Sequence, residues 1–195
     1  TSTNIKSSYR RGLEIEAGYQ LNSKFNLSGN LTISENKVDS FTQFIDNWDT
    51  WGQEMVLHEN TDLAFSPNMI WAVQADYKLN SKTTILFNSK YVGEQFIDNT
   101  SNTERMLDAY LVSNLQIDYV FNSFLFKKAK FSFLINNLFD VEYVNNAWLY
   151  RYITNSFDPT ESDIYTTLGS DGVYDMAGYF PQAKRNYLLG LTIDF

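Results

Sequence analysis

Long stretches in which apolar and polar residues alternate constrain this chain more than any other feature. The clearest one covers residues 187–195, where every odd position is apolar and every even position except Leu188 is small or polar. A period of two places successive side chains on opposite faces of an extended strand. The stretch stops on Phe195, and an aromatic end suits the lipid interface of a membrane strand better than the frayed end of a soluble sheet.

The same alternation recurs six more times along the chain. We predict seven strands, each about ten to fourteen residues long, whereas soluble strands average about five or six residues and a tilted strand that crosses a bilayer needs about nine to eleven. The alternation is clearest in the core of each predicted strand, at residues 12–21, 25–33, 69–79, 85–91, 109–121, 131–139 and 187–195. Strand length therefore favours a membrane barrel.

The connections between these strands alternate between short and long. Short polar connectors stand at 22–24, 80–82 and 127–130, whereas residues 39–66, 94–106 and 142–181 lack sustained periodicity and are predicted as long loops. This asymmetry is typical of an outer-membrane barrel with periplasmic turns and extracellular loops. The predicted fold is thus all-β, an antiparallel transmembrane β-barrel segment.

Aromatic residues are expected to form girdles at the two membrane interfaces. The predicted periplasmic girdle contains Tyr19, Phe25, Tyr77, Tyr119, Phe131 and Phe195, and the predicted outer girdle contains Trp71, Tyr91 and Phe139.

Composition excludes several classes of function and of structure. No cysteine is present, which removes thiolate nucleophiles, disulfides and cysteine-based zinc sites. The formal net charge of −8 argues against broad binding to nucleic-acid phosphates. No run reaches the roughly 18 apolar residues of a membrane-spanning helix. If the chain spans a membrane, it does so with strands.

The residues that could perform chemistry are few. His58 is the only histidine, and the acidic spacing between Asp158 and Asp175 does not match a calcium-binding loop. Glu14 and Glu16 share one face of a strand, where we expect them to line a polar barrel interior. We therefore predict no enzymatic activity, no cofactor and no metal site.

Aromatic residues in the predicted loops are the best candidates for ligand binding. Large side chains beside an arginine are typical of recognition surfaces, although they could equally pack the loops onto one another. The candidates are Trp48, Trp51, Trp148, Tyr150, Arg151 and Tyr152.

Three motifs resemble one known family. The segment N-N-L-F-D-V-E-Y at 136–143 resembles the motif before the last long loop of TonB-dependent outer-membrane receptors. The segment G-Y-F-P-Q-A-K-R-N-Y-L-L-G-L-T-I-D-F at 178–195 is similar to the closing segment of that family in the form common among Bacteroidota, and R-R-G-L-E-I-E at 10–16 is similar to one of its strands. The last strand also resembles the insertion signal of outer-membrane proteins. The residues of that signal are Tyr187, Leu189, Leu191, Ile193 and Phe195.

The resemblance implies a place in the bacterial outer membrane. It implies that residues 1–195 are the C-terminal part of a twenty-two-stranded barrel, whose plug domain and upstream strands are not in this sequence. The implied partners are the lipid bilayer, the rest of the same receptor, TonB through the missing N-terminal part, and the barrel-assembly machinery through the last strand. The implied function is TonB-dependent uptake of a scarce ligand such as a siderophore, cobalamin or glycan.

Two alternatives stay open at the level of sequence. One is a piece of a different outer-membrane barrel, such as a porin or an adhesin. The other is a soluble all-β carbohydrate-binding module, whose loops would also be rich in aromatic residues.

Overall fold

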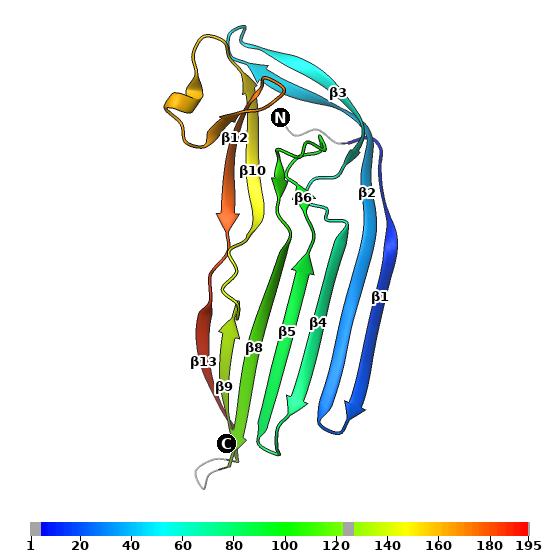
Figure 1. The fold of residues 1–195 in the computed structure, drawn as a ribbon, viewed down its shortest axis with the longest axis vertical. Coiled ribbons are helices and arrows are strands. Elements are labelled where there is room, and N and C mark those ends of the chain that lie inside the picture. The colour runs from blue at the N-terminus through cyan, green and yellow to red at the C-terminus, as the bar shows by residue number, and fades with distance from the viewer. Residues whose placement is uncertain (1–4, 123–126, 195) are drawn as a thin grey trace.

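The computed structural model describes residues 5–122 and 127–194. Figure 1 shows a curved wall of long strands with a smaller group of strands at one end. In chain order the elements are β1 (Ser8–Asn22), β2 (Phe25–Asn47), β3 (Gly52–Asp62), β4 (Met69–Lys78), β5 (Thr83–Val92), β6 (Gln95–Phe96), β7 (Met106–Leu107), β8 (Tyr110–Phe121), β9 (Lys128–Asn136), β10 (Val144–Ile153), the 3-10 turn η1 (Pro159–Glu161), β11 (Thr166–Leu168), β12 (Tyr174–Pro181) and β13 (Asn186–Asp194).

The wall consists of the seven strands expected from the alternation. They pair antiparallel in the order β1, β2, β4, β5, β8, β9, β13. Two of the short turns carry the sequence Asn-Ser-Lys, and in both the asparagine closes the turn. The Oδ1 atom of Asn22 accepts the N–H groups of Lys24 and Phe25, and Asn80 does the same for Lys82 and Thr83. This local side-chain bond is the reason for the repeated phrase.

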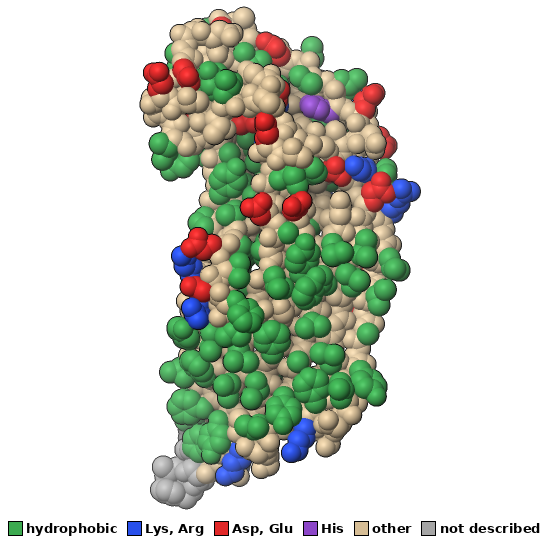
Figure 2. All heavy atoms as spheres, viewed as in Figure 1, with side chains coloured by type: hydrophobic (Ala, Val, Ile, Leu, Met, Phe, Trp, Pro, Cys, Tyr) green, Lys and Arg blue, Asp and Glu red, His purple; other side chains and the backbone are tan. Residues whose placement is uncertain are grey.

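The register keeps the apolar residues together on one face of the wall. One row across it contains Tyr19, Leu27, Ala75, Phe87, Leu115, Ile135 and Tyr187. The opposite face carries polar partners, for example Asn88 bonded to Asn114 at 2.9 Å. Figure 2 shows hydrophobic side chains spread over the long strands. The predicted two-faced barrel wall is confirmed.

The predicted girdle residues also pair across strands. Phe25 lies opposite Tyr77 and Tyr119 lies opposite Phe131, all near the short turns. At the other end Trp71 stacks on Tyr91, with ring centroids 5.7 Å apart. Of the remaining predicted members, Tyr19 and Phe139 are exposed, and Phe195 lies outside the described residues.

The predicted insertion signal forms one side of β13. Its members Tyr187, Leu189, Leu191 and Ile193 alternate along the strand, and all four side chains are exposed. Their partners on β9 are Ile135, Phe133, Phe131 and Ala129. The fifth member, Phe195, is outside the described range.

The three long connections are not irregular, and here the prediction is wrong. Strand β2 continues to Asn47 and returns as β3 through a turn in which Asn47 Oδ1 accepts the N–H groups of Asp49 and Thr50. Segment 94–106 contains β6 and β7, and segment 142–181 contains β10, η1, β11 and β12. These strands have no regular alternation of buried and exposed residues: β3 is exposed over most of its length, and β10 has buried and exposed residues in irregular order. The described residues hold thirteen strands.

These added strands lie together at what we call the loop end, residues 39–62, 94–108 and 145–176. One pairing there is parallel, since Tyr152 lies opposite Asp46 and Ile153 opposite Asn47. The sheet is therefore antiparallel with one short exception. No helix within the described ranges is long and apolar enough to cross a membrane.

The N-N-L-F-D motif joins three strands. Asn137 and Asp140 both have a positive φ, and Asn137 is buried. The backbone N–H of Asn137 donates to Asn114 on β8, and its Nδ2 donates to the carbonyl of Ala183 just before β13. Asparagine suits this position because it tolerates the left-handed backbone while bonding its neighbours. The motif therefore braces the point where the wall meets the loop end.

Candidate recognition surface

Aromatic residues join the two longest hairpins of the loop end. Trp48, in the β2–β3 turn, stacks on Tyr152 of β10 with ring centroids 4.0 Å apart and an interplanar angle of 14°. Its Nε1 donates to Tyr150 Oη at 3.2 Å, and that hydroxyl donates to Asp46 Oδ2 at 2.7 Å. The ring centroid of Phe157 lies 6.3 Å from that of Trp48. Sequence separation exceeds one hundred residues in both hydrogen bonds, so this cluster holds distant segments together.

Asp49 makes a second link between the same hairpins. Its carboxylate accepts hydrogen bonds from Thr154 Oγ1 at 3.2 Å, from the backbone N–H of Asn155 at 2.7 Å and from Ser156 Oγ. These donors, with Ser156 first, lower the pKa of Asp49 to about 2. The carboxylate therefore stays ionised at neutral pH and acts as a fixed acceptor.

A buried ion network lies on the other side of β10. Arg105 donates from Nε to Asp98 at 2.8 Å and from Nη1 to Asp175 at 3.0 Å. Arg151 donates from Nε to the other oxygen of Asp175 at 2.6 Å and from Nη2 to Asp171. Burial would raise the pKa of Asp171, but its bonds with Arg151 outweigh that effect and the pKa lies below its usual value. The network ties segment 94–108 to β10 and β12.

The six predicted ligand-binding residues fall into two groups. Trp51 is 93% exposed, Trp148 is 44% exposed, and Trp48 and Tyr150 are partly exposed. Arg151 and Tyr152 are buried. All except Trp48 and Trp51 lie within strand β10 rather than in a loop, which corrects the expectation for their setting.

The indole of Trp148 lies against Gly178 of β12. A Cβ atom at Gly178 would come within 2.2 Å of Trp148 Nε1, so only glycine permits this contact. Two members of the exposed aromatic surface, Trp148 and Tyr150, thus lie on strand β10, whereas Trp48 and Trp51 lie in the β2–β3 turn. The four exposed or partly exposed members, which we call the aromatic surface, are Trp48, Trp51, Trp148 and Tyr150.

Sequence reasoning did not single out Asp49 or Arg105, and it considered Asp175 only as part of an acidic run. No periodicity marks them, and Arg105 reaches Asp175 across 70 residues. His58 has structural partners, since it stacks on Phe41 and its Nε2 lies 2.9 Å from Gln43 Oε1. Burial lowers the pKa of His58. Within residues 5–122 and 127–194, no group of three His, Asp or Glu side chains is placed to hold a metal ion.

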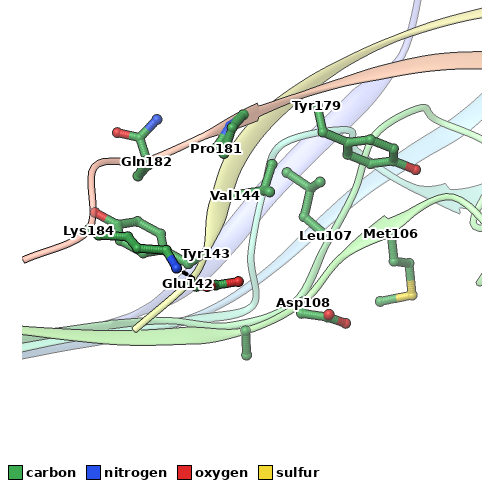
Figure 3. A pocket seen from close by; sticks show the side chains of 11 residues that line it. Met106, Leu107, Asp108, Glu142, Tyr143, Val144, Tyr179, Pro181, Gln182 and Lys184 are labelled. Carbon is green, nitrogen blue, oxygen red and sulfur yellow. Dashed lines mark ion pairs between the residues drawn. The ribbon is translucent and has the colours of Figure 1, made fainter. Parts of the chain in front are cut away.

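A cavity of about 340 Å³ lies where the wall meets the loop end. Figure 3 shows Leu107, Val144 and Tyr179 close together on one side, with the ion pair of Lys184 and Glu142 at the other. Apolar walls with a charged rim can hold a small amphipathic group. The cavity is separate from the aromatic surface.

Comparison with solved structures identifies the fold. The siderophore receptor PiuA from Acinetobacter baumannii is 14% identical with a TM-score of 0.63, and the match covers 94% of this chain and 21% of that chain. The ferric citrate transporter FecA in its unliganded form is 19% identical with a TM-score of 0.59, covering 94% and 24%. The ferric-catecholate import receptor Fiu from E. coli K12 in its open form is 15% identical with a TM-score of 0.56, covering 94% and 20%. The chain thus spans about a fifth to a quarter of the length of these receptors.

A comparison with curated proteins finds no match. The family model described as "TonB dependent receptor-like, beta-barrel" matches residues 1–138, which is more than half of the chain. The chain therefore belongs to the family of TonB-dependent receptor β-barrels.

Proposed function

We propose that residues 1–195 form the C-terminal part of a TonB-dependent receptor in the bacterial outer membrane, which takes up a scarce ligand such as a siderophore, cobalamin or glycan. Family membership is the observation that carries this proposal. The two-faced wall of seven long strands supports it. Strands of membrane barrels alternate in this way because their outer face meets lipid and their inner face lines a polar interior. Family membership argues against the porin, adhesin and soluble-module alternatives.

In this proposal the receptor is a transporter and leaves its ligand chemically unchanged. The plug and the remaining strands complete the barrel, and TonB acts through segments outside these residues. The last strand, with Tyr187, Leu189, Leu191, Ile193 and Phe195, is read by the barrel-assembly machinery.

The aromatic surface contributes to ligand capture. Trp51 and Trp148 offer the largest exposed rings, and rings of this kind dominate binding energy where they are held rigidly. Arg151 and Tyr152 act as supports of the loop end, because both are buried, Arg151 is paired with Asp175 and Tyr152 is stacked on Trp48. Loops on rigid scaffolds are where binding residues accumulate.

The experiment compares uptake by the full-length receptor and by a variant with Trp51→Ala and Trp148→Ala. Uptake at low ligand concentration should fall about tenfold or more, which corresponds to about 1.4 kcal/mol of binding free energy. Heat-modifiable migration of the barrel should not change. Phe139→Ala, which removes an exposed ring near the wall, is the matched control.

Two results would contradict the proposal. Uptake that persists in a host lacking TonB would show that transport does not depend on TonB. Recovery of the ligand in a chemically altered form would reject the role as a pure transporter.

A further inference from the structure

Charge is distributed very unevenly between the two ends of the molecule. The three segments of the loop end contain fifteen acidic residues and two basic ones, whereas the rest of the chain contains more basic than acidic residues. The formal net charge of −8 therefore arises entirely at the loop end. Figure 2 shows acidic side chains over this part of the surface.

The two basic residues of the loop end do not reach the surface. Arg105 has 4% of its side chain exposed and Arg151 has 6%, and both are paired with aspartates of the buried network. Within the three described segments of the loop end, no further cation compensates the remaining carboxylates. Asp171 is exposed but paired with Arg151, and Asp62 pairs with Lys37 just outside these segments. The exposed acidic residues besides Asp171 are Asp39, Asp49, Glu54, Glu59, Glu94, Glu104, Asp108, Asp158 and Glu161.

Members of the aromatic surface lie next to acidic residues of the loop end. Trp51 stands between Asp49 and Glu54 in sequence, and Tyr150 is bonded to Asp46. The faces of indole and phenol rings attract cations, most strongly when the cation is partly desolvated. The aromatic rings and the carboxylates at the loop end thus both favour a positively charged ligand.

We propose that the ligand captured at this end carries a net positive charge, through an amine or guanidine group, and that anionic chelates are disfavoured. This inference rests on the proposed uptake function and names the class of its substrate. A surface of one sign raises the local concentration of oppositely charged ligands and their association rate, and it repels ligands of its own sign. A ferric complex of fully deprotonated catecholates is anionic and would meet an electrostatic barrier here.

The decisive experiment measures the local potential in the full-length receptor, so that every other loop contributes. A single cysteine is introduced by Trp51→Cys, or by Ile164→Cys at the other exposed tip, because residues 1–195 contain none of their own. Each variant reacts with a cationic and an anionic methanethiosulfonate, and both rates are divided by those of a small free thiol. The cationic reagent should react about tenfold faster or more at low ionic strength. The ratio should approach one at 1 M salt, where the screening length is about 3 Å.

Charge-neutral variants provide the matched test. Glu54→Gln, Glu59→Gln and Glu161→Gln together keep the size of each side chain and should lower the rate ratio severalfold. Lys128→Gln, at the opposite end of the wall, should leave it unchanged. A ratio at or below one, or a ratio that the three replacements do not alter, overturns the proposal.

A second measurement connects the potential to uptake. The probes are one ferric trihydroxamate chelate with a pendant amine, its neutral N-acetyl form and its anionic N-succinyl form. Import should decrease in that order, and the reverse order overturns the inference. If none of the three is imported under TonB control, the proposed uptake of chelates is contradicted, whereas the thiol rates still decide the charge of the loop end.

Discussion

At the scale of single residues, two buried arginines hold the segments of the loop end together. Arg105 and Arg151 share the carboxylate of Asp175, one on each oxygen. A buried ion group of this kind is stable only while every member is paired, because removal of one partner leaves an uncompensated charge in a poorly solvated place. The network is therefore essential locally, even if an apolar core of equal volume would be no less stable.

Replacement of Arg151 should open the loop end without unfolding the wall. Arg151→Met removes one of the two arginine partners of Asp175 and the main partner of Asp171, and we expect a cost of about 3–5 kcal/mol. Hydrogen exchange of the amides in β10 and β12 of the full-length receptor measures it. Arg11→Met breaks an exposed pair with Glu35 and should leave this exchange almost unchanged, because water solvates both groups of such a pair. Equal effects from the two changes would contradict the role given to the network.

The two faces of the wall can be tested by charge. Phe87 lies in the apolar row between Ala75 and Leu115, whereas Asn88 lies on the opposite face and bonds Asn114. Phe87→Arg should cost roughly 2–4 kcal/mol because it places a charge in lipid, and Asn88→Arg at most about 1 kcal/mol.

Urea unfolding of the full-length receptor in lipid vesicles measures both changes. The same contrast between Leu191→Arg and Thr192→Arg should be smaller, since Leu191 pairs with Phe131 near the short turns. If Asn88→Arg proves the more damaging change, the assignment of faces is wrong.

At the scale of elements, the β2–β3 and β10–β12 hairpins form one unit. A short parallel pairing of β10 with β2 joins them. The stacking of Trp48 on Tyr152 and the hydrogen bonds to Asp49 join them as well. Contacts of three different kinds restrict sliding, rotation and separation together. The two hairpins should therefore move as one body during any opening of the receptor.

Spin labels at Trp51→Cys and Ile164→Cys can test this coupling. Both positions are almost fully exposed, so the labels should not disturb packing. The full-length receptor should give one narrow distance distribution, and Trp48→Ala should broaden it by removing the stack and the bond to Tyr150. Phe139→Ala should leave the distribution narrow. A broad distribution in the unmodified background would show that the hairpins are independent.

At the scale of the whole molecule, the wall has two open edges. Among the described residues β1 pairs only with β2, and β13 pairs only with β9. The seven wall strands are antiparallel and odd in number, so direct closure would place β1 and β13 parallel, whereas bacterial single-chain barrels have even counts. Each unpaired backbone group in lipid costs several kcal/mol.

The 195-residue chain expressed alone should therefore not form a closed pore. We expect aggregates or oligomers paired edge to edge when it is purified in detergent. Size analysis and planar-bilayer recording provide the measurement. A monodisperse monomer that conducts ions through a stable pore would contradict the expectation.

The wall could be predicted closely from the sequence, and the loop end could not. All seven wall strands and their apolar faces follow from alternation, because lipid contact on one side demands an apolar residue at every second position. Strand β3 and strand β10 carry no such signal. Their neighbours differ from residue to residue, as Trp48 on one side of β10 and Asp175 on the other illustrate.

The candidate recognition residues were only partly separable by sequence. Exposed Trp51 and buried Tyr152 look alike as aromatic residues of the predicted loops, and packing against Trp48 distinguishes them. The partners of Arg105 and Arg151 could not be predicted from the sequence either, because only packing brings them together. Their aspartates lie 7 to 70 residues away in sequence without a spacing rule.

The sequence by itself determined the all-β class, the strand faces, the tight Asn-Ser-Lys turns and the concentration of acidic residues in the long connections. These properties depend on neighbouring residues and on the solvent that each face meets, so a local pattern records them. Only the tertiary structure decided that the connections fold into strands, that both loop-end arginines are buried and that two distant hairpins are joined. Such pairings depend on three-dimensional proximity between segments about one hundred residues apart, and no local pattern encodes which of many possible partners meet.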